Sequence, residues 1–278
     1  MLISIITPSF NGEKFLRNCI ESVLQACDGL EFEHIVVDGA STDGTLDILK
    51  KYPHVRWISE KDNGMYDAIN KGIRMATGLY IGHLNSDEQY NREGLQKAIQ
   101  KLREKRADAV FSPTIMINGR FEFLQLFNQV VVPRVEDTHW CMPVQSCSLL
   151  YKRSIWERYP YNAQYRFAGD HDFFRQQMER GLSIVSSRTP IGIFTWHREN
   201  LSSSQKEAFA RENVLADIDK KSLRIKWIKH VYRIKKLFMG AYIRKPLSYS
   251  YFQDGVLLDK HIPKPRLKLS RQEFETLL

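Results

Sequence analysis

Along the first 112 residues, apolar runs typical of strands alternate with apolar residues at helical spacing. Short apolar, β-branched runs predict strands at residues 2–7, 33–38, 55–59, 79–84 and 107–111. Between them, apolar residues at helical spacing predict one helix capped by Asn11 and further helices at 45–52, 66–76 and 92–105. Strands that are each separated by a helix favour an α/β fold with a doubly wound, mainly parallel sheet and helices on both faces.

The rhythm changes after Phe111. Residues 115–123 predict a β-hairpin in which Asn118-Gly119 forms a tight turn, and a loop-rich section is expected at 125–142. Residues 144–151 then predict a strand and 173–180 a helix, with short strands at 183–185 and 191–194. No internal repeat accompanies this change of rhythm.

Polar side chains follow each of the first four strands, as Thr7-Pro8-Ser9, Asp38, Glu60-Lys61-Asp62 and Asn85-Ser86-Asp87. The carboxyl ends of parallel strands meet at one rim of a sheet, and ligands bind in the crevice there. The carboxylate of Asp87 beside two oxygen-bearing side chains suits a hard divalent cation. The alternative is a helix cap formed by Asp87 or Asn91. Neither a GxGxxG nor a GxxxxGK[ST] pattern occurs, which disfavours dinucleotide and Walker-type sites.

The net charge of +9 is concentrated near the C-terminus. Residues 220–245 contain ten Lys and Arg and no acid, and the rest of the chain carries −1. An apolar stripe within residues 222–242 predicts an amphipathic helix, with Leu223, Trp227, Val231, Ile234, Phe238 and Ala241 on one side. Such a helix suits an anionic membrane surface, and the alternative is a helix packed on the domain. No reader motif accompanies the charge, so nucleic acid is not an expected partner.

The sequence shows no apolar run long enough for a membrane span and no signal peptide. Its four cysteines are scattered without a CxxC pair. We therefore expect reduced thiols and a cytoplasmic protein.

Four ordered motifs resemble those of the family 2 glycosyltransferases, and the resemblance extends over about residues 1–200. They are Thr7–Asn11, Val36–Thr45, Asp62–Gly72 and Gly82–Asp87. The resemblance implies the GT-A fold and an inverting enzyme of bacterial polysaccharide biosynthesis. It also implies a UDP- or GDP-linked sugar donor, a Mn²⁺ or Mg²⁺ ion, and transfer to a saccharide hydroxyl. The basic helix adds the expectation of a lipid-linked acceptor at the inner face of the cell membrane.

The resemblance assigns roles by position in the motifs. The donor-binding residues would be Thr7, Pro8, Ser9, Asn11, Asp38, Ser41, Asp67, Asn85 and Ser86. Asp87 would be the metal ligand, and His197 a third ligand or a diphosphate contact. Asn85 stands where the family has the first acid of its metal motif, so it offers a carbonyl oxygen but no charge.

The acceptor side carries the expected base. Asp170 aligns with the family's general base, Gly169 replaces the acid that usually precedes it, and Asp172 is expected to cap the next helix. Trp140 and Gln145 fall in the acceptor segment, where Trp140 would stack on a sugar or belong to the core.

These predictions divide the chain into a catalytic domain at 1–215 and a basic helical extension at 216–278. Within the domain, residues 1–112 would bind the donor and 113–215 the acceptor. The predicted function is metal-assisted glycosyl transfer. The alternatives are a non-catalytic nucleotide-sugar or membrane-binding module and a nucleotidyltransferase, for which the Gly- and Arg-rich N-terminal signature is absent.

Overall fold

The computed structural model describes residues 2–127, 131–138, 142, 144–197, 200, 212 and 223–268. In chain order the elements are β1 (Ile3–Ser9), α1 (Leu16–Ala26), β2 (Phe32–Asp38), α2 (Thr45–Leu49), β3 (Val55–Ser59), α3 (Met65–Met75), β4 (Tyr80–His83), β5 (Gln89–Tyr90), α4 (Arg92–Lys105), β6 (Ala109–Phe111), β7 (Thr114–Asn118), β8 (Phe123–Phe127), α5 (Val135–Thr138), η1 (Ser146–Ser148), β9 (Leu149–Lys152), α6 (Arg153–Arg158), α7 (Gly169–Glu179), β10 (Ile184–Ser186), β11 (Gly192–Trp196), α10 (Leu223–Phe238), β12 (Leu247–Gln253) and β13 (Val256–Ile262).

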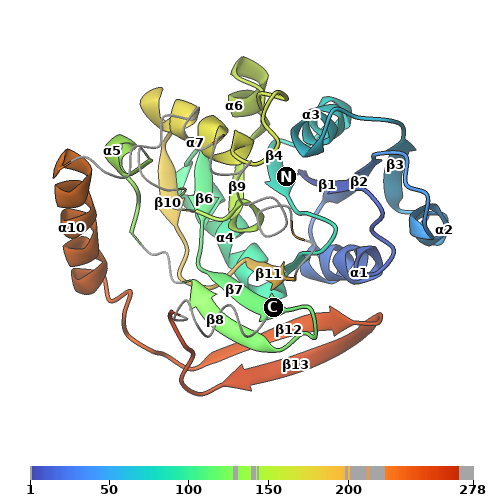
Figure 1. Ribbon diagram of the computed structural model, residues 1–278. Helices are drawn as coiled ribbons and strands as arrows, with labels where there is room; N and C mark the ends of the chain where they lie inside the picture. The colour runs from blue at the N-terminus through green and yellow to red at the C-terminus, as the bar shows by residue number, and fades with distance from the viewer. Residues whose placement is uncertain are drawn as a thin grey trace.

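A mixed, mainly parallel sheet forms the centre of the molecule, with strand order β10-β6-β9-β4-β1-β2-β3 (Figure 1). Strands β4, β1, β2 and β3 are parallel neighbours, and β9 runs antiparallel between β4 and β6. All seven residues of β1 are buried because helices cover both faces of the sheet at this strand. The α/β prediction is therefore confirmed.

Two separate apolar clusters show which helices cover which face. On one face, Ile3 and Ile5 of β1 pack with residues of α1 and α4 such as Val23 and Leu95. On the other face, Ile6 packs with residues of α3, α6 and α7. Because side chains alternate across a strand, the single apolar strand β1 supplies both cores.

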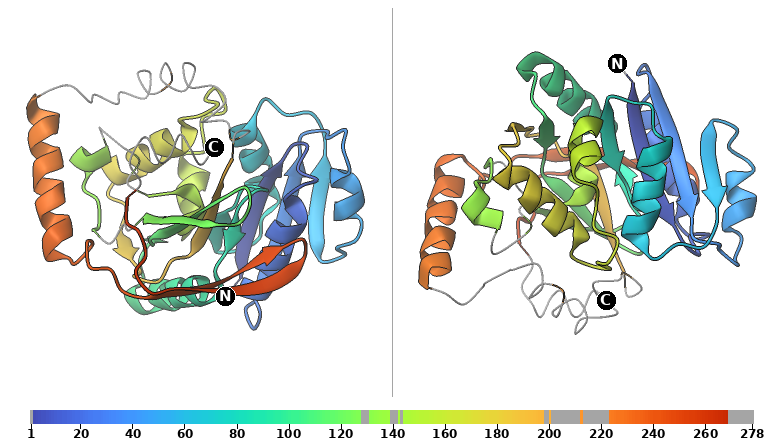
Figure 2. Two further views of the ribbon diagram at one scale, coloured as in Figure 1. Left: turned by 60° about the horizontal axis from the view of Figure 1, so that its bottom comes forward. Right: turned by 90° about the horizontal axis from the view of Figure 1, so that it is seen from above.

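A second sheet, β5-β11-β7-β8, lies beside the main one, and the β12–β13 hairpin packs against it (Figures 1 and 2). Leu247, Tyr249 and Tyr251 of β12 join Ile115 and Ile193 in one apolar cluster. The prediction of a basic helical extension at 216–278 is wrong for residues 247–262, which form a hairpin because alternate apolar residues there cover the second sheet.

Local chemistry changes three further details. The hairpin at 114–127 is present, but its loop spans 119–122 and has its positive φ at Phe121. The Asn118 side chain stabilises this longer loop by accepting bonds from the backbone N–H groups of Arg120 and Glu122. Asn11 does not cap α1, since its side-chain oxygen accepts from Thr42 N. Helix α7 begins at Gly169, so Asp172 lies inside it and does not cap it.

The predicted basic helix exists as α10 and lies at the edge of the molecule far from α2 (Figure 1). It buries Ile225, Ile228 and Tyr232 against the domain. Leu223, Trp227 and Phe238 of the predicted stripe are 81%, 66% and 85% exposed. Within the described ranges, no helix combines the length and apolar character needed to cross a bilayer.

Candidate active site

The carboxyl ends of β1, β2 and β4 form one rim, as the sequence predicts. Ser9 at the end of β1 is paired in register with Asp38 at the end of β2. The segment that contains Asn85 and Asp87 follows β4, the other neighbour of β1. Parallel strands thus bring three of the predicted motifs to one edge of the sheet.

A hydrogen-bonded network links the loops at this rim. Asp38 is fully buried, and its carboxylate accepts bonds from Ser41 N at 2.9 Å, from Ser41 Oγ and from Ser59 Oγ at 2.7 Å. Ser41 Oγ also accepts the backbone N–H of Asn11 at 2.7 Å. Asp38 therefore holds the loops after β1, β2 and β3 in fixed relative positions.

A close approach of the chain follows β1. A Cβ atom at Gly12 would lie 2.7 Å from Ser9 Oγ and 3.4 Å from Ser86 Oγ, so a larger residue would have to displace the Ser9 hydroxyl. Ser9 Oγ is buried and has no hydrogen-bond partner among the described residues. The Ser9 and Ser86 hydroxyls therefore meet near Gly12 at this part of the rim, and hydroxyl groups can donate hydrogen bonds to phosphate oxygens.

Three predicted donor residues make contacts within the protein. The hydroxyl of Thr7 is buried on the α1 side of the sheet, 3.0 Å from His34 Nε2, and does not reach the rim. Asp67, in the first turn of α3, accepts the backbone N–H of Asn63 at 3.0 Å and lies 3.8 Å from Lys71 Nζ. Pro8 is a buried residue of β1, paired with Val37.

The structure adds Asp62 and Phe10 to the rim. A Cβ atom at Gly39 would lie 2.8 Å from Asp62 Oδ2 and 3.3 Å from the Phe10 ring, and Phe10 is exposed. The position of Asp62 after β3 was a sequence signal for this placement, whereas nothing in the pattern marked Phe10.

The side chain of Asn85 points to the interior and does not offer its oxygen to the rim. That oxygen lies 3.0 Å from Nε2 of buried His83, whose pKa burial lowers to about 4, so the ring is neutral. The backbone N–H of Asn85 donates to Glu88 Oε2 at 2.8 Å. Burial, together with the charge of Asp87, raises the pKa of Glu88 well above its usual range.

Asp87, in the turn between β4 and β5, lies next to His197, the residue that follows β11. Asp87 Oδ2 accepts from His197 Nε2 at 2.8 Å and from Asn200 Nδ2 at 2.9 Å, and the His197 ring stacks on Phe15. Adjacent ligands of an octahedral cation bound at about 2.1 Å are about 3.0 Å apart, so this pair fits two positions on one ion. Across the described ranges no cluster of three His, Cys, Asp or Glu that could hold a metal ion occurs.

Asp170 lies in the first turn of α7, next to Tyr66 of α3. Asp170 Oδ1 accepts from His171 N at 2.8 Å and from the Tyr66 hydroxyl at 3.2 Å. Within the described part of the chain, Oδ2 accepts no hydrogen bond. Burial raises the pKa of Asp170, although bonds from His171 N and Tyr66 partly oppose this. A carboxylate with one open oxygen and a raised pKa is suited to accept a proton.

Close packing explains why glycine precedes Asp170. A Cβ atom at Gly169 would lie 2.7 Å from the Tyr66 ring. Asp172, by contrast, pairs with Arg175 at 3.1 Å and accepts from Gln176 at 2.7 Å. Gln145 is the half-buried residue before η1, and Trp140 lies outside the described residues.

Comparisons with known proteins show the family and the fold of the chain. The family model described as "Glycosyl transferase family 2" matches residues 4–177. The chain belongs to this glycosyltransferase family. A curated relative, the putative teichuronic acid biosynthesis glycosyltransferase TuaG of Bacillus subtilis, is 36% identical over 110 residues. That match covers 37% of this chain and 43% of TuaG, so the chain spans less than half of that relative.

Two solved structures share the fold of this family 2 chain. The crystal structure of S. aureus TarS 1–349 in complex with UDP-GlcNAc has a TM-score of 0.61 at 20% identity, covering 87% of this chain and 72% of that one. The mannosyltransferase PcManGT from Pyrobaculum calidifontis, in complex with GDP-Man and Mn2+, has a TM-score of 0.55 at 16% identity and covers 86% and 81%. These neighbours support the GT-A architecture.

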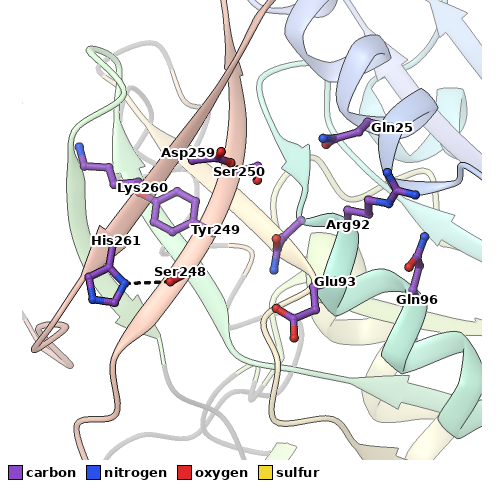
Figure 3. A pocket seen from close by; sticks show the side chains of 11 residues that line it. Gln25, Arg92, Glu93, Gln96, Ser248, Tyr249, Ser250, Asp259, Lys260 and His261 are labelled. Carbon is purple, nitrogen blue, oxygen red and sulfur yellow. Dashed lines mark hydrogen bonds between the residues drawn. The ribbon is translucent and has the colours of Figure 1, made fainter.

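A separate pocket of about 540 Å³ lies away from the rim of this transferase (Figure 3). Its walls come from the start of α4, including Arg92 and Glu93, and from the β12–β13 hairpin, including Ser250 and Lys260. None of the predicted site residues lines it, so it is not part of the candidate active site.

Proposed function

We propose that the chain transfers a glycosyl group from a UDP- or GDP-linked sugar to a saccharide hydroxyl with inversion. The observation that carries this proposal is the side chain of Asp170, which is polar, partly buried and open at Oδ2. In a single displacement the acceptor oxygen bonds to the anomeric carbon as the bond to the diphosphate breaks. The electron pair leaves with the nucleoside diphosphate, and Oδ2 of Asp170 takes the acceptor proton.

The donor would lie along the rim. The loops held by Asp38 and Ser41 would face the nucleoside, with Asn11 at their edge. The hydroxyls of Ser9 and Ser86 on either side of Gly12 would face the phosphates. Gln145 is proposed for the acceptor side. The match to TuaG, a protein of teichuronic acid biosynthesis, supports a polysaccharide precursor, and the basic helix supports a lipid-linked one.

We assign a Mn²⁺ or Mg²⁺ ion to Asp87 and His197. Such an ion supplies positive charge for the departing diphosphate. Asn85 is not assigned to the ion, because its side-chain oxygen already accepts a hydrogen bond from His83 and carries no charge. Asp87 Oδ2 is held by His197 and Asn200, and the bond from His197 Nε2 would be replaced when both residues bind the ion.

The test is release of UDP or GDP from a panel of UDP-Glc, UDP-GlcNAc, UDP-Gal and GDP-Man, with Mn²⁺ or with EDTA. We expect one donor to be consumed, and Asp87→Asn to weaken Mn²⁺-dependent nucleotide affinity by roughly 10- to 100-fold. Equal affinity in mutant and wild type would overturn the metal assignment. Donor binding without turnover, with any acceptor saccharide added, would favour the non-catalytic module.

We also propose that the chain works at the inner, cytoplasmic face of the membrane, with α10 lying on the lipid surface. Helix α10 turns its second apolar face outward, with Leu223, Trp227 and Phe238 exposed. Lys and Arg fill the positions beside this stripe. Each cation near an anionic leaflet adds about 1 kcal/mol of attraction, and the apolar stripe can enter the interface.

Co-sedimentation of the full-length protein with phosphatidylcholine vesicles, with and without phosphatidylglycerol, tests this. We expect binding to the anionic vesicles that weakens with salt and is lost in Trp227→Glu/Phe238→Glu. The matched control is Leu257→Glu, which changes an exposed apolar residue of β13 and should bind as wild type does. Wild-type protein that stays in the supernatant at low salt would contradict the proposal.

A further inference from the structure

A carboxylate from a distant part of the chain sits in front of the helix that carries Asp170. Glu212 accepts the backbone N–H groups of three consecutive residues, Arg166 at 2.8 Å, Phe167 at 2.7 Å and Ala168 at 3.1 Å. The next residue, Gly169, is the first of α7. Glu212 thus fixes the turn from which the base-bearing helix starts.

Tyr66 holds the same turn from the other side. Its hydroxyl lies 3.1 Å from the carbonyl oxygen of Phe167 and 3.2 Å from Asp170 Oδ1. The Tyr66 ring packs where a side chain of residue 169 would begin. Two residues remote in sequence therefore set the position of Asp170.

The start of a helix is a poor place for a base. The helix dipole and unpaired N–H groups stabilise an ionised carboxylate in the first turn, which lowers its affinity for a proton. The negative charge of Glu212, placed on N–H groups just before this turn, opposes that effect. No cation among the described residues pairs with Glu212.

We propose that Glu212 is a positioning residue for the candidate base: it holds the turn before α7 and places a negative charge near Asp170, which makes Asp170 a stronger proton acceptor. This inference rests on the proposed function, in which Asp170 takes the acceptor proton. The proposal also accounts for Gly169, which stands where the family usually has an acid before the base. Glu212 would supply the negative charge that this acid supplies elsewhere in the family.

Few other charged or titratable groups face Asp170. Tyr66 and Tyr161 are buried near it, and burial raises the pKa of both phenols, so they stay neutral. The ring of His171 is bonded to the Thr138 carbonyl oxygen. Asp172 is paired with Arg175, so this pair contributes little net charge. Among these groups, Glu212 is the one that brings a negative charge to the turn before Asp170.

The test compares the pH dependence of kcat in wild type and variants of the full chain. In Glu212→Gln the acidic limb of the kcat profile should shift to lower pH by about half a unit, because the loss of the negative charge lowers the pKa of Asp170. In Tyr66→Phe it should move up, because a donor to the ionised carboxylate is lost. Glu179→Gln removes an exposed charge at the other end of α7 and should leave the limb in place.

Glu212→Asp keeps the charge and should keep the limb near its wild-type position, even if a looser turn lowers kcat. An unchanged limb in a folded Glu212→Gln protein would overturn the proposal. If wild type shows no transfer, the proposed function fails separately, and the pKa of Asp170 is then measured by carbon-13 NMR. Equal values in wild type and Glu212→Gln would refute the role of Glu212. If Glu212→Gln does not fold, Glu212→Asp is compared with Tyr66→Phe, and circular dichroism like that of wild type shows that both variants are folded. A smaller shift of the acidic limb of kcat in Glu212→Asp than in Tyr66→Phe supports the proposal, and a larger shift refutes it.

Discussion

The two sides of the candidate site use carboxylates in opposite ways. On the donor side, Asp38 is fully buried and accepts three hydrogen bonds from Ser41 and Ser59. On the acceptor side, Asp170 is partly buried, and both of its bonds go to one oxygen. A carboxylate whose two oxygens both accept hydrogen bonds holds loops in place, whereas a carboxylate with an open oxygen and a raised pKa can take a proton.

This difference shows that burial alone does not identify a base. Asp172 is also buried and lies two residues from Asp170, yet Arg175 and Gln176 occupy both of its oxygens. Among these acids, the hydrogen-bond partners separate the structural ones from the candidate base. Substitutions at each should therefore differ in which property they change.

The largest effect is expected for Asp170→Asn. Transfer should fall by roughly 10²-fold or more, because the amide cannot take the acceptor proton, while donor affinity stays near wild type. Rates of nucleotide release and nucleotide titrations measure the two quantities. The control is Asp172→Asn, which should reduce stability more than it reduces turnover. Undiminished transfer in Asp170→Asn would move the base elsewhere.

Substitutions at Asp38 and Asp170 should also differ in their effect on the free energy of unfolding, and this difference is smaller than the effect on transfer. Asp38→Asn places an amide NH₂ against donors, so the free energy of unfolding should fall by about 2 kcal/mol. Asp170→Asn relieves the cost of a buried charge and should leave stability equal or higher. Urea unfolding at pH 7 measures both, with Ser59→Ala expected to fall between them. Equal stability of Asp38→Asn and wild type would remove the contrast.

The same contrast explains what the sequence could predict. Asp38 and Asp87 follow apolar strands, so the strand pattern placed them on one rim without any tertiary information. The surroundings of Asp170 come from Tyr66 and Glu212, which lie 104 and 42 positions away in the chain. No local pattern encodes such contacts, so the positioning of the base was not predictable.

The β12–β13 hairpin, in contrast, was predictable but missed. Leu247, Tyr249 and Tyr251 alternate with polar residues, and Asp254-Gly255 is a hairpin turn signal with positive φ at both positions. The dense positive charge before it favoured a helical interpretation of the whole segment. At Asn118-Gly119 the sequence predicted a tight hairpin turn that is not formed, because the Asn118 side chain stabilises a longer loop.

The smallest expected effect lies at the opposite end of the sheet from the rim, at Glu33. Although partial burial alone would raise it, the pKa of Glu33 is lowered by bonds from Ser4, Thr77 and Arg56. A lowered pKa in the folded state means that the unfolded chain binds more protons in acid. The stabilisation is therefore present above about pH 4.3 and lost as the pH falls through the folded pKa.

Glu33→Gln should lower the free energy of unfolding by about 1 kcal/mol at pH 7, and the difference from wild type should shrink below pH 4. Urea unfolding at pH 7, 5, 4 and 3 measures it. Glu93→Gln, which breaks an exposed pair with Lys97, is the matched control and should run parallel to wild type. If the free energies of unfolding of Glu33→Gln and wild type differed by the same amount at every pH, Glu33 would stabilise the protein by packing and not by its charge. It would then give no contrast with Asp170, whose raised pKa predicts the opposite slope.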